Sequence, residues 1–207
     1  PQLQAFEDLE ETFTRVENLL FAIQPKEGDI FTREVLAVIE DLTEETWRTS
    51  SVNRVDSITN YQHTEADGDD LIVSNLVEFP AQLTDEDLDR IRNIALNEPL
   101  VVNRLVSKDG RIAGINIDLH LEEGEKDQNI VKAHWAWDKK AELMEKYPNL
   151  DVYATGSVII SSSFSETAVR DMTTQTPMMY VFVIIVLGLL LRSVTGVVGI
   201  VVTTLMT

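Results

Sequence analysis

The C-terminal end of the sequence constrains the fold most, because Arg192 is the only charged residue between positions 177 and 207. As a single helix this stretch would be about 46 Å long at about 1.5 Å per residue, whereas the hydrocarbon core of a bilayer is about 30 Å thick. One tilted helix would also hold Arg192 near the bilayer centre, which costs about 2.5–3.5 kcal/mol on insertion scales. The sequence therefore predicts a transmembrane helix over residues 173–191, a cytoplasmic turn at 192–193, and the truncated start of a second transmembrane helix over 194–207.

Arg192 also predicts the orientation of the chain, because positively charged residues in short loops stay on the cytoplasmic side of a membrane. Residues 1–172 are then expected outside the cytoplasm. A buried hairpin of a large soluble protein is the less favoured alternative, because so long a charge-poor stretch is rare in soluble folds. The first residue is Pro1 and the last apolar segment ends without a polar flank, so we expect an internal fragment of a longer protein.

The composition excludes several classes of protein. Residues 1–176 carry all 35 acidic residues and all but one of the 17 basic residues, and the whole chain has a net charge of −18. Such a surface argues against a nucleic-acid partner, because phosphate binding requires fields of lysine and arginine. The chain has no cysteine, which excludes disulfides, cysteine-ligated metals and cysteine nucleophiles within this span.

Hydrophobic periodicity predicts an α+β domain before the apolar end. The pattern predicts strands over residues 18–24, 52–58, 101–107, 111–121 and 151–160, and helices over residues 32–48, 84–98 and 130–147. Two of the strands flank Lys108-Asp109-Gly110, which is typical of a hairpin turn. Without an insertion at about 60–99, this order predicts a ferredoxin-like split βαβ fold with helices on one face of the sheet.

The helical patterns also predict which side chains are buried. The first helix is expected to begin after Thr32 as its N-cap and to bury Val35, Ile39, Leu42 and Trp47. The second is expected to begin with a capping box formed by Thr84 and Asp87. The third is expected to bury Ile130, Ala133 or His134, Trp137, Ala141 and Met144.

No residue pattern predicts an active site, a cofactor or a metal centre. His63, His120 and His134 lie far apart in the sequence and form no ligand pair. The acidic residues around Gly68 do not follow the order of a calcium-binding loop. Ser161, Ser162 and Ser163 lie in no nucleophile elbow, and Trp135 and Trp137 point to different helix faces, where core packing is favoured. The sequence therefore predicts that the chain is not an enzyme.

Several sequence strings carry a resemblance to a known family. They are GDIFTREVLAVIEDLTEETW, NRVDSITNYQHTEADGDDLIVSNLVE, IRNIALNEPLVVNRLVSKDGRIAGINIDL and, near the C-terminus, LLLRSVTG. In this order, from about Asn18 onward, they resemble the RND (resistance-nodulation-division) superfamily of transporters, and most of all its MMPL-type, hydrophobe/amphiphile exporter branch.

The resemblance implies that residues 1–172 are the first periplasmic porter domain of a multi-pass protein of the bacterial inner membrane. It implies export of hydrophobic or amphiphilic small molecules or lipids by proton antiport, a homo-oligomer, the lipid bilayer as a partner and a possible periplasmic partner protein. The acidic residues that carry protons in this superfamily lie in later membrane helices, so no proton-relay residue is assigned here. The polar helical stretch at 164–176 is expected to be the mechanical link between domain and membrane.

Two other functions stay open at this point. One is an extracytoplasmic sensor domain of a membrane receptor, and the other is an RND-type accessory protein for protein translocation or sterol sensing. A sensor would continue from its membrane helix into a charged cytoplasmic linker. Here another apolar segment follows Arg192 and Ser193 at once, which favours the exporter.

Overall fold

The computed structural model describes residues 16–67, 70–120, 126–191 and 199, and the chain divides into two compact units, Pro1–Ser161 and Ser162–Thr207.

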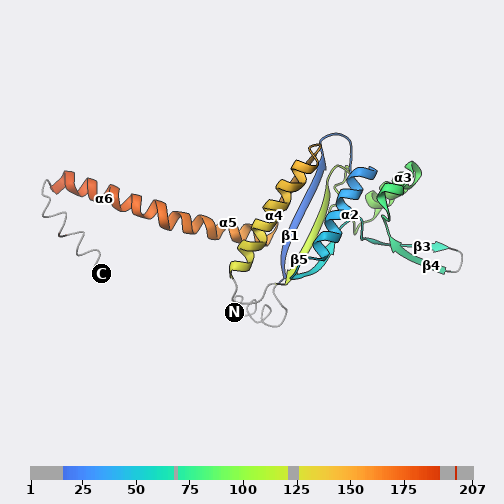
Figure 1. Cartoon of the computed structure of the whole chain (residues 1–207), viewed down its shortest axis with the longest axis horizontal. Coiled ribbons are helices and arrows are strands. Elements are labelled where there is room, and N and C mark those ends of the chain that lie inside the picture. The colour runs from blue at the N-terminus through green and yellow to red at the C-terminus, as the bar shows by residue number, and fades with distance from the viewer. Residues whose placement is uncertain (1–15, 68–69, 121–125, 192–198, 200–207) are drawn as a thin grey trace. The chain divides into compact units, whose positions relative to one another are not determined.

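The first unit is built on a four-stranded antiparallel sheet (Figure 1). Its strands are β1 (Val16–Pro25), β2 (Val52–Asp56), β5 (Ala113–His120) and β6 (Leu150–Thr155), in the spatial order β2-β5-β1-β6. β1 pairs with both β5 and β6 and is therefore central. With one helix after the first strand and another before the last, this order is the predicted ferredoxin-like split βαβ arrangement, so the predicted α+β class is confirmed.

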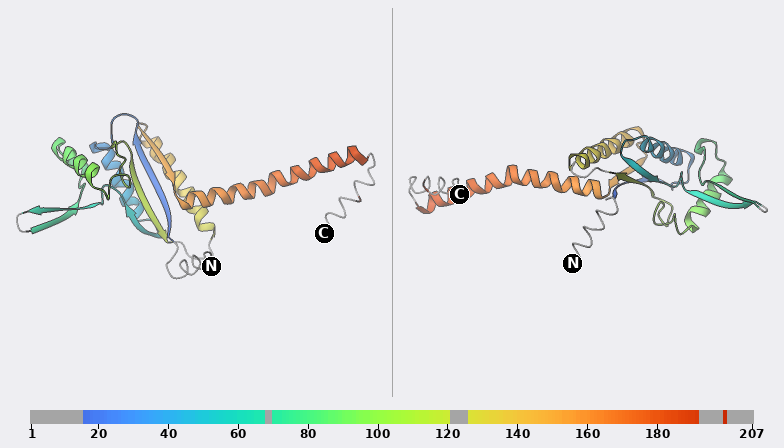
Figure 2. Two further views of the ribbon diagram at one scale, coloured as in Figure 1. Left: turned by 180° about the vertical axis from the view of Figure 1, so that it is seen from behind. Right: turned by 90° about the horizontal axis from the view of Figure 1, so that it is seen from below.

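Helices α2 (Arg33–Trp47) and α4 (Lys126–Lys146) lie on one face of this sheet (Figure 2). The side chains that alternate toward them from the central strands are buried, among them Leu19, Phe21 and Ile23 of β1. The alternation predicted for β5 is also confirmed, since Ile115, Ile117 and Leu119 are buried while the residues between them are partly exposed. Period-2 patterning on one buried face fixes this register, because a slip of one residue would turn every apolar side chain outward.

Helix α2 begins where the sequence predicts. The Thr32 hydroxyl accepts a hydrogen bond from the Val35 amide, and Val35, Ile39 and Leu42 are buried as expected. The prediction for Trp47 is wrong, because 47% of this side chain is exposed at the last residue of the helix.

Helix α4 buries only part of the predicted stripe. Ala133 is buried as predicted and is joined by Ala136 and Leu143, whereas Ala141 and Met144 are exposed. The stripe includes Lys139, whose side chain is only 8% exposed while its ammonium pairs with Glu45 at 2.6 Å and Glu142 at 2.7 Å. A lysine counts as polar in a hydrophobic pattern even when its aliphatic stem packs against the core. The pattern therefore did not indicate which side of α4 faces the sheet.

The strand predicted over residues 101–107 is absent, and the one predicted over residues 151–160 is shorter than expected. Residues 101–112 do not form a hairpin with the following strand: they are irregular apart from isolated bridges at Val106, and β5 pairs with β1 and β2 instead. The Ser107 hydroxyl holds this loop by accepting hydrogen bonds from the amides of Arg111 and Ile112. The last strand ends at Thr155 rather than at residue 160, because Gly156, with φ of 124°, turns the chain into helix α5 (Ser157–Arg170).

The insertion holds a second, two-stranded sheet that the sequence did not predict. Strands β3 (Gln62–Asp67) and β4 (Asp70–Asn75) form an antiparallel hairpin, followed by the short 3-10 helix η1 (Pro80–Gln82) and helix α3 (Asp85–Asn97). The hairpin escaped prediction because β4 buries neither face. No alternation of apolar and polar residues therefore marks it as a strand.

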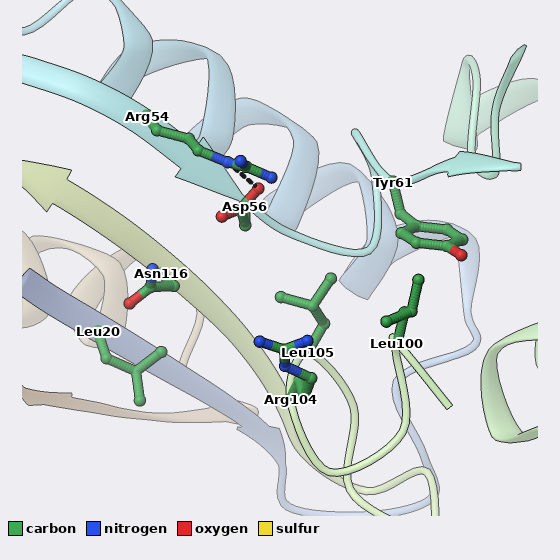
Figure 3. A pocket seen from close by; sticks show the side chains of 8 residues that line it. All are labelled: Leu20, Arg54, Asp56, Tyr61, Leu100, Arg104, Leu105 and Asn116. Carbon is green, nitrogen blue, oxygen red and sulfur yellow. Dashed lines mark hydrogen bonds and ion pairs between the residues drawn. The ribbon is translucent and has the colours of Figure 1, made fainter. Parts of the chain in front are cut away.

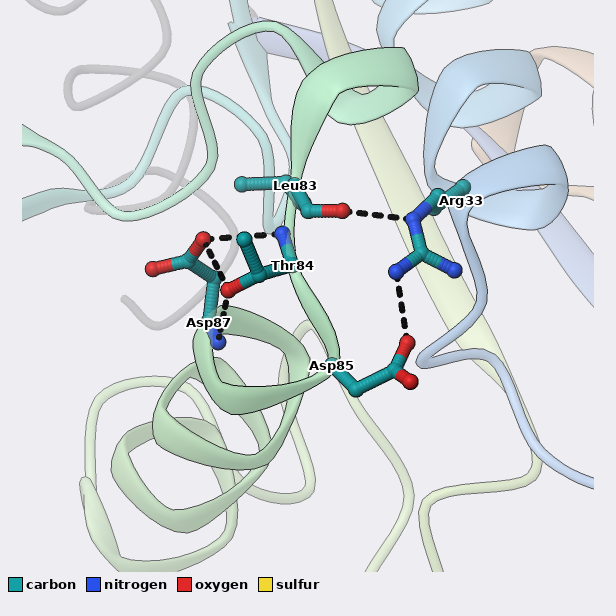
Figure 4. A network of polar contacts seen from close by, with 5 residues as sticks. All are labelled: Arg33, Leu83, Thr84, Asp85 and Asp87. Carbon is teal, nitrogen blue, oxygen red and sulfur yellow. Dashed lines mark hydrogen bonds and ion pairs between the residues drawn. The ribbon is translucent and has the colours of Figure 1, made fainter.

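The N-terminus of α3 has the predicted capping box (Figure 4). The Asp87 amide donates to the Thr84 hydroxyl at 3.2 Å, and the Asp87 carboxylate accepts from the Thr84 amide at 2.9 Å. Arg33, the first residue of α2, donates to the Leu83 carbonyl and to Asp85, both at 2.5 Å. The box thus fixes the start of the inserted helix, and the arginine ties it to α2 in the helix layer of the domain.

Removing the Asp87 carboxylate should destabilise the domain at neutral pH but not in acid. The hydrogen bonds from the Thr84 side chain and backbone lower the pKa of Asp87, so its stabilisation is present above the unfolded-state pKa and is lost as the pH falls through the lower folded-state value. In urea unfolding of Asp87→Asn, we expect a lower midpoint than wild type at pH 7 and converging midpoints near pH 2. Glu86→Gln, in the same first turn but outside the box, is the control, and an equal loss there would assign the effect to general charge.

The described part of the second unit is helical. After the end of α5, the π-helix η2 (Asp171–Gln175) leads into α6 (Thr176–Leu191). No helix in the described residues is long and apolar enough to cross a membrane. The predicted helix over 173–191 is thus found only in part, since its first residues are π-helical and α6 itself has 16 residues, about 24 Å at about 1.5 Å per residue. Arg192, the turn at 192–193 and the segment 194–207, apart from Gly199, lie outside the described residues.

Candidate functional site

The face of the four-stranded sheet opposite the helices is only partly covered. Its side chains come from the same strands as the core but from the alternate positions. Leu20 of β1 lies opposite Asn116 of β5, which in turn lies opposite Asp56 of β2. All three side chains are partly exposed. The irregular loop at 98–112 borders this face in place of a helix.

A cavity of about 510 Å³ lies between this loop and the sheet (Figure 3). The sheet, the segment before β3 and the loop each contribute to its wall. The lining residues are Leu20, Arg54, Asp56, Tyr61, Leu100, Arg104, Leu105 and Asn116. The cavity therefore combines aliphatic side chains with two guanidinium groups, a phenol and an amide.

The polar groups of the cavity differ in how they are already paired. Arg54 forms an ion pair with Asp56 at 2.8 Å, and the Asn116 amide donates to Asp118 at 3.0 Å. In the described part of the chain Arg104 has no ion-pair partner, and its side chain is exposed. Desolvation, with a smaller effect of the Glu98 charge, raises the pKa of Tyr61, so this phenol stays neutral and able to donate a hydrogen bond.

This arrangement is suited to binding rather than to catalysis. The aliphatic residues can bury an apolar group, while Arg104 and Tyr61 can bind a polar or anionic one. No nucleophile and base lie together among the lining residues. Among the residues that the structure describes, no group of three or more histidine, cysteine, aspartate or glutamate side chains could hold a metal ion.

The structure separates the candidate residues considered from sequence. His63 lies in β3, 3.7 Å from Glu65, while His120 ends β5. His134, on α4, packs edge-to-face on Trp137 with 5.2 Å between ring centroids. The three serines at 161–163 lie on α5, and Gly68 lies outside the described residues. The core role favoured for one tryptophan is confirmed, because Trp135 packs edge-to-face on the buried Phe21 with 6.0 Å between centroids.

Sequence reasoning missed the cavity and its two arginines. A signal was present: Arg104, Lys108 and Arg111 lie within eight positions in a chain of net charge −18. A basic cluster in so acidic a sequence indicates a local requirement for positive charge. Its position beside the uncovered sheet face follows only from the tertiary structure.

A model of the MMPL family matches residues 1–207. No curated protein matches the chain significantly.

Proposed function

Because the chain belongs to the MMPL family, a family of membrane transporters, we propose that it supplies the periplasmic porter domain of a proton-motive-force-driven exporter of hydrophobic or amphiphilic compounds or lipids. The observation that carries the proposal is the family match over residues 1–207, and the split βαβ domain followed by an apolar helix supports it. The proposed exporter works as a homo-oligomer in the bacterial inner membrane.

The surface of α6 supports a membrane location. Met178, Tyr180, Phe182 and Ile185 are between 53% and 73% exposed, and every residue from 178 to 186 is an exposed apolar or aromatic one, so all sides of this part of the helix are apolar. An apolar surface of this extent requires an apolar environment. We therefore place α6 in the bilayer as part of a multi-pass protein, with residues 1–172 in the periplasm and Arg192 at a cytoplasmic turn.

Cysteine labelling of the full-length protein in intact cells tests this topology. The chain has no cysteine between positions 1 and 207, so cysteines need to be replaced only elsewhere. A membrane-impermeant maleimide should label Lys108→Cys in intact cells and Ser193→Cys only after permeabilisation. Labelling of both variants, or of neither, in intact cells would contradict the proposed orientation.

Transport itself is tested with a fluorescent lipophilic probe in cells that overproduce the full-length protein. We expect probe efflux that stops when a protonophore collapses the proton gradient. An unchanged efflux after collapse would exclude proton coupling. A protein that exports nothing but changes a cytoplasmic signal when the probe binds would instead be the sensor.

The cavity on the open sheet face is the proposed contact surface for the apolar part of the exported molecule. Leu100 is 57% exposed there, so a bound molecule could cover it without displacing core residues. Covering about half of a leucine side chain stabilises a complex by about 1 kcal/mol, which corresponds to about a fivefold change in affinity.

Leu100→Ser should therefore raise the probe concentration at half-maximal efflux about fivefold, because a hydroxymethyl group offers little apolar surface. The measurement is efflux rate against probe concentration at equal amounts of protein in the membrane. Val131→Ser is the matched control, since Val131 is 63% exposed on α4, in the helix layer. Equal effects of the two substitutions, or no effect of Leu100→Ser, would remove the cavity from the transport path.

A further inference from the structure

The β3–β4 hairpin has an uncovered apolar surface. Leu71, Ile72 and Val73 are consecutive residues of β4 and are 73%, 51% and 56% exposed. A two-stranded hairpin is at best marginally stable by itself in water. Three consecutive exposed apolar residues on such a hairpin are unfavourable in water and promote association. The composition of this hairpin is therefore typical of a surface that contacts another protein chain.

The strand register assigns the two faces of the hairpin different roles. Glu65 lies opposite Ile72, and Arg90 of α3 pairs with Glu65 at 2.6 Å, so this face is turned toward the inserted helix. The other face carries Thr64 opposite Val73 and Ala66 opposite Leu71. All four of these side chains are exposed. We call this second face the arm face.

A complementary surface lies beside the cavity already described. A groove of about 290 Å³ runs between the loop at 103–107 and the sheet, and its wall is mainly apolar. Leu20, Ala22, Leu105 and Ile112 are among its lining residues, together with Arg104. Ile112 is 37% exposed, and Lys108 and Arg111 follow as exposed basic residues of the same loop.

The charges of the two surfaces are opposite. Between positions 62 and 75 the sequence has four acidic residues and no lysine or arginine, whereas between 100 and 112 it has three basic residues and one acidic residue. The acidic hairpin would be repelled by the anionic headgroups of a bilayer. Arg104 in the groove wall and the two other basic residues of the same loop would attract it instead.

We propose that the arm face of one copy of this protein docks in the groove between the 103–107 loop and the sheet of a second copy. Tyr61, which precedes β3, already lines the cavity beside that groove. Six extended residues place the hairpin tip about 20 Å from this base, and the ribbon points away from the four-stranded sheet (Figures 1 and 2). The arm face of one copy can therefore contact the groove of a neighbouring copy, but not the groove of the same copy.

Such a contact joins different surfaces of identical subunits and is heterologous, so it closes a ring when the rotation between subunits permits. Each arm would then border the cavity of the next subunit, because cavity and groove share Leu20, Arg104 and Leu105. The inference rests on the proposed homo-oligomer and assigns its contact surfaces.

Disulfide trapping between two differently tagged copies of the full-length protein tests the contact. One copy carries Leu71→Cys and the other Ile112→Cys, and oxidation in the membrane should give a dimer that holds both tags. Ile72→Cys is the matched control, because it lies on the same strand with the opposite facing. We expect at least a fivefold lower yield of dimer with Ile72→Cys. Adding Arg104→Glu to the Ile112→Cys copy should reduce the Leu71→Cys yield at least threefold.

Co-purification of the two tags without oxidation reports oligomerisation separately. If the tags co-purify but Leu71→Cys gives no mixed dimer, or no more than Ile72→Cys gives, the arm contact is overturned while the homo-oligomer stands. If the tags do not co-purify and no dimer forms, both are overturned. Efflux of the probe is measured independently, so neither result is confused with a failure of the transport proposal.

Discussion

Replacing Gly156 by alanine is expected to lower the free energy of unfolding by about 3 kcal/mol or more, because backbone strain and steric overlap act together. Gly156 has φ of 124°, a conformation that L-residues rarely adopt. A Cβ atom there would overlap the Asn18 carbonyl oxygen and lie 2.9 Å from the Leu19 Cα. Both neighbours belong to the central strand β1, so the overlap is not relieved by rotating a side chain.

The close approach at Gly156 also sets two hydrogen bonds that join β1 to the start of α5. The Ser157 amide donates to the Asn18 side chain and the Asn18 amide donates to the Ser157 hydroxyl, both at 2.9 Å. Moving the chain away to accommodate a methyl group would lengthen them. The local sequence thus fixes where β6 ends and α5 begins.

The measurement is thermal unfolding of the purified full-length protein. A loss of about 3 kcal/mol in a domain of this size lowers Tm by about 6–12 °C. Gly28→Ala is the matched control: Gly28 also has a positive φ, 77°, but no atom lies within 4 Å of its added Cβ. Strain alone should cost about 1 kcal/mol there. Equal shifts for the two variants would show that the contact with β1 does not matter.

The elements that could be predicted from sequence are those with one buried face. The alternation in β5 follows from the burial of one strand face, and the caps at Thr32 and Thr84 follow from the free amides at a helix N-terminus. Both requirements are local and can be recognised in the sequence. The split βαβ order then follows from the sequence of elements. Lys139 shows the limit of this reasoning, because a buried lysine stem paired with Glu45 cannot be distinguished from a solvated lysine without the tertiary contacts.

The candidate site was less accessible to prediction for a different reason. Its surface is assembled from alternate residues of β1, β2 and β5 and from a loop whose path depends on Ser107. None of these segments has an unusual local pattern except for the cluster of basic residues. The β3–β4 hairpin likewise lacks a buried face. Its apolar residues can be recognised as a contact surface only when their exposure is known.

Inserting four glycines between Met172 and Thr173 is expected to abolish at least 90% of probe efflux while leaving the amount of protein in the membrane unchanged. Residues 162–191 form one uninterrupted helical run with a π-helical turn at 171–175. A continuous helix transmits displacement along its axis, whereas each glycine weakens it by about 1 kcal/mol relative to alanine. If proton binding in the membrane moves the periplasmic domain through this segment, a flexible break should uncouple proton binding from the movement of the domain.

An insertion of four alanines at the same site separates stiffness from length. Four helical residues add about 6 Å and turn the following helix by only about 40°, so helical continuity is kept while the length changes equally. Efflux should survive in the alanine variant to a clearly greater extent than in the glycine variant, measured at equal surface labelling of Lys108→Cys in both. Wild-type efflux with four glycines would exclude residues 164–176 as the mechanical link. Equal loss in both variants would show that spacing, rather than rigidity, is what the segment supplies.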